Sequence, residues 1–267
     1  MLINKMLKEC VSKRIPLPVA RNIVAEEIIL RKIASSDLAD HVTLKGGIVM
    51  YNLSKNDRRV TKDIDFNLIR FSIDEKTLKL FVQKMNEVND GFKIFIKGKP
   101  KQLNQEDYRG LRIHLVIKDV NNDSLQLKLD IGVHTYLAIE QNTMIYSFSA
   151  LNECVSLKTN SPEQIVAEKL LSLARLGPAS TRHKDLFDIY YLISKNLVNT
   201  KKVSKIIELF FENSRRKPNN VAEFQYVIED TLSNPFFASE ATRPENKWID
   251  VEYEELKKEI LQFIMHL

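Results

Sequence analysis

The chain has 267 residues, of which 44% are hydrophobic and 28% charged, a balance typical of a globular protein and not of a disordered one. No apolar run reaches the roughly 18 residues of a membrane span, and the first residues lack the apolar stretch of a signal peptide. The two cysteines, Cys10 and Cys154, match no metal-ligand spacing. We therefore expect reduced thiols, no membrane association and a cytoplasmic location.

The net charge of +5 is concentrated in the first part of the chain. Residues 1–160 hold 25 Lys and Arg against 19 Asp and Glu, whereas residues 161–267 hold 15 against 16. A basic first part is compatible with nucleic acid or nucleotide phosphates as partners. A solvated surface rich in lysine explains the same numbers, so charge alone does not choose between these readings.

The first elements in chain order are a helix, a short strand and a second helix. Apolar residues recur at helical spacing over residues 17–39. A short apolar segment at residues 42–44 is followed by Gly46-Gly47 and then by the apolar residues 48–51. This order predicts a strand, a tight turn and a helix.

Alternating apolar and polar residues then predict a sheet. The cleanest alternation lies on either side of the turn-forming residues 121–123, which predicts a hairpin. We expect strands at residues 59–69, 92–98, 110–119 and 124–133, and a helix at residues 73–88. These elements predict a mixed sheet with helices packed on it.

From Ser161 onward the period is helical. Ser161-Pro162-Glu163-Gln164 provides an N-cap, a proline at the first helical position and a glutamine at the third, and Gly177-Pro178 ends the helix. Further helices are expected at residues 181–194, 201–213, 220–232 and 251–267. The prediction is an α+β fold with an α/β domain at residues 1–160, including an N-terminal helical extension, and a helical domain at residues 161–267.

The strand RVTKDIDFNL, residues 59–68, carries two acids one residue apart. Because alternate side chains of a strand share a face, Asp63, Asp65 and Asn67 lie together, opposite the apolar residues between them. Two carboxylates this close repel each other unless a cation or hydrogen bonds offset the repulsion. Mg²⁺ fits, because it takes oxygen ligands and is often held by carboxylates plus substrate phosphates.

Asp130 is a candidate third ligand. It shares a face with Gln126 and Lys128 on the strand that begins at Ser124. Three carboxylates on adjacent strands would form a two-metal site of the kind used in phosphoryl chemistry. The alternative is that all three acids only keep the surface soluble. An isolated DxD is a weak signal and by itself favours this alternative.

The glycine pair strengthens the functional interpretation. Placed between a strand and a helix, Gly46-Gly47 lets a phosphate approach the backbone N–H groups at the start of the helix. The pattern is neither a Walker P-loop nor a dinucleotide fingerprint. A glycine turn followed by a DxD strand is a joint signal for nucleotide chemistry.

At this point a family resemblance emerges. LKGGIVMYNL followed by RVTKDIDFNL resembles the opening of the nucleotidyltransferase superfamily of the DNA-polymerase-β type. PEQIVAEKLLSLARL and RHKDLFDIYYL resemble the AbiEii/AbiGii toxin family, including the MenT-type toxins. The resemblance spans about residues 40–195. One departure is Ile48, where the family often has Thr or Ser, which removes a possible phosphate contact; Thr61 is a candidate to supply it.

The resemblance implies roles for two residues of the helical part. Lys169 would contact the nucleotide phosphates, and Asp185 would orient Lys169 or accept a proton, while Asp188 would brace the helix through Lys184 or a nearby arginine. The residues alone suggest less: Lys169 is explained by a packed stem with its amine in water, and Asp185 by an ion pair with the residue three positions earlier.

The resemblance also implies a mechanism and a biology. Asp63, Asp65 and Asp130 would hold two Mg²⁺ ions beneath an NTP, and Gly46 and Gly47 would cradle its phosphates. Arg59 and Thr61 would assist. The chain would be the toxin of a bacterial toxin–antitoxin or phage-defence pair, with an antitoxin as partner and an RNA, foremost tRNA 3′ ends, as acceptor.

Other interpretations stay open at this stage. The acceptor could be a hydroxyl of a small molecule or of a protein, or the chain could be a catalytically silent module that binds nucleotide or RNA. Retention of all three acids and of Lys169 counts against mere binding. A basic run at Lys97, Lys99 and Lys101, with aromatic residues nearby, could contact an RNA backbone, but the residues alone favour a solvated loop.

Overall fold

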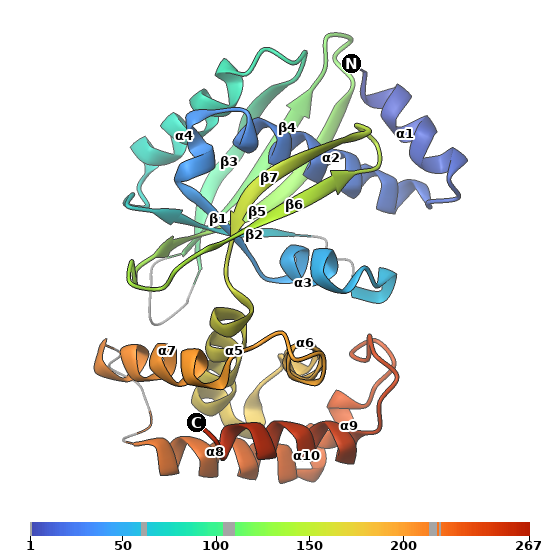
Figure 1. Ribbon diagram of the computed structural model, residues 1–267. Coiled ribbons are helices and arrows are strands. Elements are labelled where there is room, and N and C mark those ends of the chain that lie inside the picture. The colour runs from blue at the N-terminus through green and yellow to red at the C-terminus, as the bar shows by residue number, and fades with distance from the viewer. Residues whose placement is uncertain (1, 60–62, 104–109, 214–217, 219) are drawn as a thin grey trace. The chain divides into compact units, whose positions relative to one another are not determined.

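A computed structural model describes residues 2–59, 63–103, 110–213, 218 and 220–267 (Figure 1). The chain divides into two compact units: unit 1 comprises residues 1–55 and 60–160, and unit 2 comprises residues 56–59 and 161–267. Across these described ranges, no helix combines the length and the apolarity needed to cross a bilayer. Both cysteines are free.

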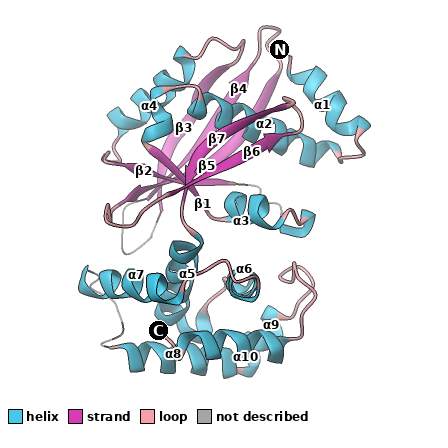
Figure 2. Ribbon diagram, in the orientation of Figure 1, coloured by secondary structure: helices cyan, strands magenta, loops and turns pink. Residues whose placement is uncertain are grey.

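Unit 1 is built on one mixed sheet, shown in magenta in Figure 2. Its strands are β1 (Val42–Lys45), β2 (Ile64–Ile69), β3 (Lys93–Leu103), β4 (Gly110–Lys118), β5 (Ser124–His134), β6 (Asn142–Phe148) and β7 (Glu153–Thr159). Their order across the sheet is β3-β4-β5-β2-β1-β7-β6. The β2–β5 and β1–β7 pairs are parallel, and the other four pairs are antiparallel.

Helices cover the apolar face of this sheet. They are α2 (Leu17–Ala34) and α4 (Glu75–Glu87), and α1 (Ile3–Ser12) packs against α2 (Figure 1). The ring of Phe66 on β2 lies 5.3 Å from the ring of Phe81 on α4, and both are buried. Helix α3 (Gly47–Ser54) packs against β1 and β2, and a short 3₁₀ turn, η1 (Asp37–Asp40), precedes β1.

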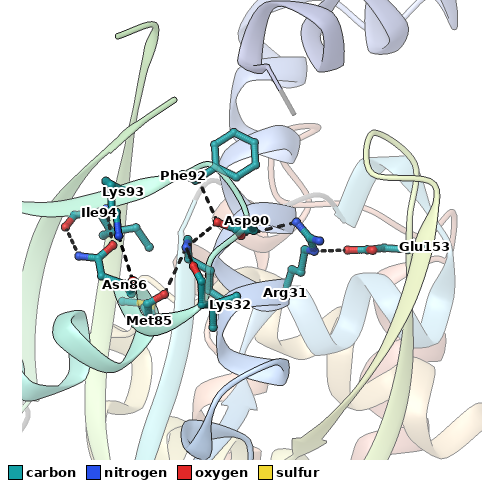
Figure 3. Close-up of polar contacts among 10 residues, drawn as sticks. Arg31, Lys32, Met85, Asn86, Asp90, Phe92, Lys93, Ile94 and Glu153 are labelled. Atoms are coloured by element: carbon teal, nitrogen blue, oxygen red, sulfur yellow. Dashed lines mark hydrogen bonds and ion pairs between the residues drawn. The ribbon is translucent and has the colours of Figure 1, made fainter. Parts of the chain in front are cut away.

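An ion-pair network that is buried at Lys32 and Asp90 ties α2 to the α4–β3 turn and to β7 (Figure 3). Lys32, fully buried, donates to Asp90 Oδ1 at 2.7 Å and to the carbonyl oxygens of Met85 and Val88. Arg31 approaches Asp90 at 3.5 Å and Glu153 at 2.8 Å. Burial lowers the pKa of Lys32, and the pairing with Asp90 opposes this effect. Each buried charge therefore has a partner, as burial requires.

Unit 2 is helical. Its helices are α5 (Pro162–Leu176), α6 (His183–Ser194), α7 (Thr200–Asn213), α8 (Val221–Ser233), α9 (Pro235–Ala241) and α10 (Tyr253–Ile264), with a 3₁₀ turn η3 (Gly177–Ala179) after α5. Helix α5 packs against α6, α7 and α8. The side chain of Ser161 accepts the N–H of Gln164, as the capping pattern predicts, and Gly177 ends α5 with a φ of 56°.

Residues 56–59 belong to unit 2 although they stand within the first part of the sequence. Asn56 donates to the carbonyl oxygen of Trp248 at 3.1 Å, and Arg58 forms a two-pronged ion pair with Asp250 at 2.8 and 2.9 Å. Arg59, the last residue of the 3₁₀ turn η2 (Asp57–Arg59), is buried. We call residues 56–59 the strap.

Most expected elements are confirmed, and the differences have physical reasons. The predicted strand at residues 59–69 is shorter: β2 begins at Ile64, Arg59 lies in the strap, and residues 60–62 fall outside the described part of the chain. Helices α1 and α9 and strands β6 and β7 were not predicted. Strand β6 lies at the sheet edge and exposes Ile145, so its alternation is weak.

Candidate active site

Strand β2 divides its side chains between the core and the opposite face, as predicted. Ile64, Phe66 and Leu68 are buried in the core. Asp65 points to the opposite face and is in direct register with Asp130 on the parallel neighbour β5. Neighbouring strands lie about 4.8 Å apart, so these two carboxylates are adjacent. We call this side of the sheet the acidic face.

The glycine turn lies directly against Asp65. Gly46 has φ 67° and ψ −143°, a conformation available to glycine and costly for other residues. A β-carbon on Gly46 would lie 2.6 Å from Asp65 Oδ2, which is closer than atoms pack. Gly47 is the first residue of α3. The two motifs GG and DxD therefore meet in space, with the glycine backbone beside the carboxylate.

Two basic side chains neutralise the acids. Arg112 on β4 binds both oxygens of Asp130 at 2.7 Å, and Lys128 on β5 binds Asp63 at 2.6 Å. The hydrogen bond to Asp130 raises the pKa of Arg112, and the charges of Asp63 and Asp65 raise it further. Arg112 thus lies in the field of all three acids.

In unit 2, Lys169 is held between two carboxylates. Its ammonium donates to Asp185 Oδ1 and pairs with Asp188 Oδ2 at 2.9 Å. The side chain of Lys169 is only 11% exposed, so its amine is not in water, contrary to the alternative offered by the sequence. Burial acts to lower the pKa of Lys169, but the charges of Asp185 and Asp188 outweigh it and raise the pKa.

Asp188 is braced from the strap and not through Lys184. Arg59 Nε and Nη2 donate to the two oxygens of Asp188, each at 2.7 Å, and Asp188 is fully buried. Burial acts to raise the pKa of Asp188, but Lys169 and Arg59 outweigh it and lower the pKa. Arg59, expected as a helper at the phosphates, is occupied here by Asp188. Thr61, the other expected helper, lies outside the described residues.

A small pocket of unit 2 adjoins Lys169. It is lined by Lys169, Ser172, Leu173, Ser180, Arg182, Asp185, Leu186 and Ile189. Ser172 Oγ is buried and has no hydrogen-bond partner within the described structure. Arg182 approaches Asp185 at 4.0 Å, the weak ion pair that the sequence suggested. The pocket thus combines two cations with hydroxyl groups.

Comparison with known families decides the class of the protein. A family model described as "Nucleotidyl transferase AbiEii toxin, Type IV TA system" matches residues 28–266. The chain belongs to the AbiEii family. It is therefore a nucleotidyltransferase toxin of a type IV toxin–antitoxin system, which implies an NTP as substrate and an antitoxin as counterpart. The resemblance drawn from the GG, DxD and KD motifs is confirmed.

Other comparisons add little to the AbiEii assignment. A search of curated proteins gives no match. Among solved structures, the chain is similar to one described as "antigenic nucleotidyltransferase-like protein from Paracoccidioides brasiliensis". The identity is 14%, the TM-score is 0.39, and the match covers 81% of this chain and 93% of the other.

The acidic face of this AbiEii protein fits a divalent cation by its donor chemistry. Its donors are carboxylate oxygens, and it already attracts a guanidinium and an ammonium group. Across the described residues, no three His, Cys, Asp or Glu side chains converge into a ready metal site. Mg²⁺ is commonly held by one or two carboxylates plus substrate phosphates, and the adjacent Asp65 and Asp130 match these donors in kind and number.

Arg112 and Lys128, which hold the acids, were not predicted as site residues from the sequence. A signal for Arg112 was present. The predicted turn at residues 121–123 fixes the hairpin register, and counting outward from Lys118 and Ser124 pairs Arg112 with Asp130. Lys128 shares its face with Asp130 by alternation, but its partner Asp63 directly precedes β2, which meets β5 only through a parallel pairing.

Proposed function

We propose that the protein transfers a nucleoside monophosphate from an NTP to a hydroxyl of RNA, foremost at tRNA 3′ ends, and releases pyrophosphate as part of toxin or phage-defence activity. The main support for this proposal is the arrangement of Gly46, Asp65 and Asp130, which sets two adjacent carboxylates beside a backbone that a phosphate can approach. The AbiEii family supplies the reaction class.

The acids act through charge. Asp65 and Asp130, with Asp63 two residues before Asp65, are the residues that would hold Mg²⁺. When bound, Mg²⁺ supplies charge neutralisation for the triphosphate and for the attacking oxygen. Asp63 and Asp130 are paired with Lys128 and Arg112, so these two basic side chains would compete with a cation for the same carboxylates.

The transfer step itself is an in-line displacement. The acceptor oxygen forms a bond to the α-phosphorus, the bond from that phosphorus to the bridging oxygen breaks, and pyrophosphate leaves with the electron pair; the hydroxyl proton passes to solvent. The residues contribute position and charge and form no covalent bond. Gly46 and Gly47 present the start of α3 to a phosphate, since a helix N-terminus attracts anions.

Lys169 and Asp185 complete the proposal. Asp185 and Asp188 hold the ammonium of Lys169 in one place, which suits a point charge that binds phosphate. Asp185 then acts as a positioning residue for Lys169, and Arg59 supports the pair through Asp188. The test is Lys169→Met: it should raise the KM for NTP, whereas a purely structural role predicts a loss of stability with an unchanged KM.

The experiment that tests the function uses labelled NTPs, Mg²⁺, total RNA and a total protein extract. We expect label in RNA with the wild type and none with Asp63→Ala or Asp65→Ala. Asp37→Ala, which changes an exposed acid of the same unit, is the matched control and should keep activity. If the label appears in protein or in a small molecule, that molecule and not RNA is the acceptor. Labelling that survives Asp65→Ala would refute the mechanism.

A further inference from the structure

The acidic face continues beyond Asp130 as an open surface of β3, β4 and β5. On edge strand β3, Ile94 is 1% exposed and faces the core, whereas its neighbour Phe95 is 50% exposed. The antiparallel registers place Phe95 opposite Val116 and Lys97 opposite His114. Residues paired across strands share a face, so these side chains line one surface.

This surface and the candidate active site are on the same side of the sheet. Arg112 joins them: it is in register with Lys101 on β3 and with Asp130 on β5, and it binds Asp130 directly. One row of side chains therefore runs from Asp65 through Asp130 and Arg112 to Lys101.

The charge along this row changes from acidic to basic. Arg112 and Lys128 are paired with aspartates, but the four lysines nearer the edge of the sheet are not. Within the described structure, no carboxylate pairs with Lys93, Lys97, Lys101 or Lys118. Lys93 donates to a backbone carbonyl, and Lys97 donates to the side chain of Gln126. We call Lys93, Phe95, Lys97, Lys101 and Lys118 the basic strip.

Phe95 gives the basic strip an aromatic centre. Its ring is half exposed, and the ammonium of Lys118 lies 5.9 Å from the ring centroid. Lysines around an exposed aromatic ring are the combination that binds single-stranded nucleic acid, because bases stack on the ring while phosphates meet the cations. The lysines alone would not distinguish RNA from other polyanions.

We propose that the basic strip is the docking surface for the single-stranded part of the RNA acceptor, with a base stacked on Phe95 and the backbone phosphates on Lys97 and Lys101. This inference rests on the proposed function, because the strip adjoins Asp130 and would bring the end of the strand to the acids. The proposal depends on the positive charge of the strip, which complements the RNA phosphates, and on the exposed ring of Phe95.

The competing explanation is protection of a sheet edge. Lysines on an edge strand discourage pairing with other chains. That explanation does not call for an exposed phenylalanine on the same strand and face, because an exposed ring promotes association. The two explanations also predict different effects of substitution: edge protection predicts aggregation of lysine variants with unchanged RNA affinity.

Binding is measured by fluorescence anisotropy with a labelled 12-nucleotide single-stranded RNA of mixed sequence, in EDTA and without NTP, so that no transfer occurs. Phe95→Ala should weaken binding about tenfold, with recovery in Phe95→Trp. The double variant Lys97→Gln/Lys101→Gln should reduce the slope of the logarithm of the binding constant against the logarithm of salt concentration by about 1.4. Each lost phosphate contact contributes roughly 0.7 to that slope. Tyr226→Ala and Lys201→Gln/Lys202→Gln, which alter an exposed ring and two exposed lysines of unit 2, are the matched controls.

The proposal is overturned if the strip variants bind like wild type, if the control variants weaken binding equally, or if an RNA duplex competes as well as the single strand. Its failure is separable from that of the proposed function. If the strip variants still label RNA when RNA is limiting, the docking surface is refuted and the proposed transferase function stands. If the wild type labels no RNA but the strip variants lose RNA binding, the docking surface is supported and the proposed transferase function is refuted.

Discussion

Gly46 leaves no room for a side chain beside Asp65: a β-carbon there would lie 2.6 Å from the carboxylate oxygen. The backbone of Gly46 also has a positive φ that favours glycine. The position is thus constrained twice, once by conformation and once by the neighbouring acid.

The first prediction follows from this contact. Gly46→Ala should abolish RNA labelling, since it moves either the turn or Asp65, and it should lower the free energy of unfolding by about 1–3 kcal/mol through backbone strain. Gly98→Ala is the matched control: Gly98 has a φ of 73°, but no atom lies within 4 Å of its added β-carbon. Gly98→Ala should lose stability and keep the NTP-dependent transfer at saturating RNA, where a change in the neighbouring basic strip has no effect on the rate. Equal activity of the two variants would refute a special role for Gly46.

The second prediction compares two neighbouring arginines of the strap. Arg59 binds the buried Asp188 and Arg58 binds the exposed Asp250, both through two bonds. Arg59→Met should destabilise the protein by about 3 kcal/mol, because it leaves a buried carboxylate short of a partner. Arg58→Met should change stability little, since the ion pair is solvated. Urea denaturation monitored by circular dichroism measures both; equal effects would contradict the assignment.

The pH dependence of the same pair has a definite sign. The pKa of Asp188 is lowered in the folded protein, so its pairing stabilises the fold above the unfolded pKa near 3.8 and is lost as pH falls through the folded value. Arg59→Met should therefore reduce stability most near neutral pH and converge on wild type in acid. A constant difference across pH would show that packing, and not charge, accounts for the loss.

The third prediction concerns Glu26 on α2. Its Oε1 is buried without a hydrogen-bond partner within the described structure, and burial raises its pKa to about 8, with the charges of Glu27 and Asp63 adding to the effect. Between the unfolded pKa of 4.5 and 8, the unfolded chain ionises this group and the folded protein does not. Glu26 therefore lowers stability by roughly 1.4 kcal/mol per pH unit across this window.

Glu26→Gln should remove that slope. The variant should resemble wild type near pH 5 and exceed it in thermal stability at pH 8, as measured by melting curves at a series of pH values. Glu254→Gln, at an exposed position of α10, serves as the control and should follow wild type throughout. If the difference in thermal stability between wild type and Glu26→Gln does not grow with pH, Glu26 is ionised in the folded protein.

The fourth prediction concerns the competition for Asp63. Lys128 binds this carboxylate at 2.6 Å, so it would compete with a metal ion for the same group. Lys128→Gln should lower the Mg²⁺ concentration for half-maximal RNA labelling about two- to fivefold, because the acids lose a competing cation. Lys158→Gln, which breaks an ion pair with Asp40 in the same unit, should leave the requirement unchanged. A higher Mg²⁺ requirement in Lys128→Gln would mean that Lys128 assists the metal.

Local patterns predicted much of this molecule. The alternation of β2 placed Asp65 opposite the core residues, the hairpin turn set the β4–β5 pairing, and the capping pattern at Ser161 located the start of α5. Each depends on residues within a few positions of one another. The family resemblance supplied the rest of the functional hypothesis.

Contacts between distant segments could not be predicted in the same way. The register of the parallel β2–β5 pair decides that Asp65 faces Asp130, and no turn connects these strands directly. Arg59 finds Asp188 across 129 positions of sequence. Such pairings are chosen by the packing of whole elements, and a single sequence without such a connection leaves several registers open.

The strap has a consequence for dissecting this toxin. The polypeptide enters the helical unit at Asn56, returns to the sheet unit after Arg59, and enters the helical unit again at Ser161. A fragment that begins at Ser161 therefore lacks the guanidinium that Asp188 binds, and a fragment that ends at Asn160 carries a basic segment deprived of its partners. The two halves are interlaced through the chain itself, so swapping or truncating them at that junction would yield pieces that are each incomplete.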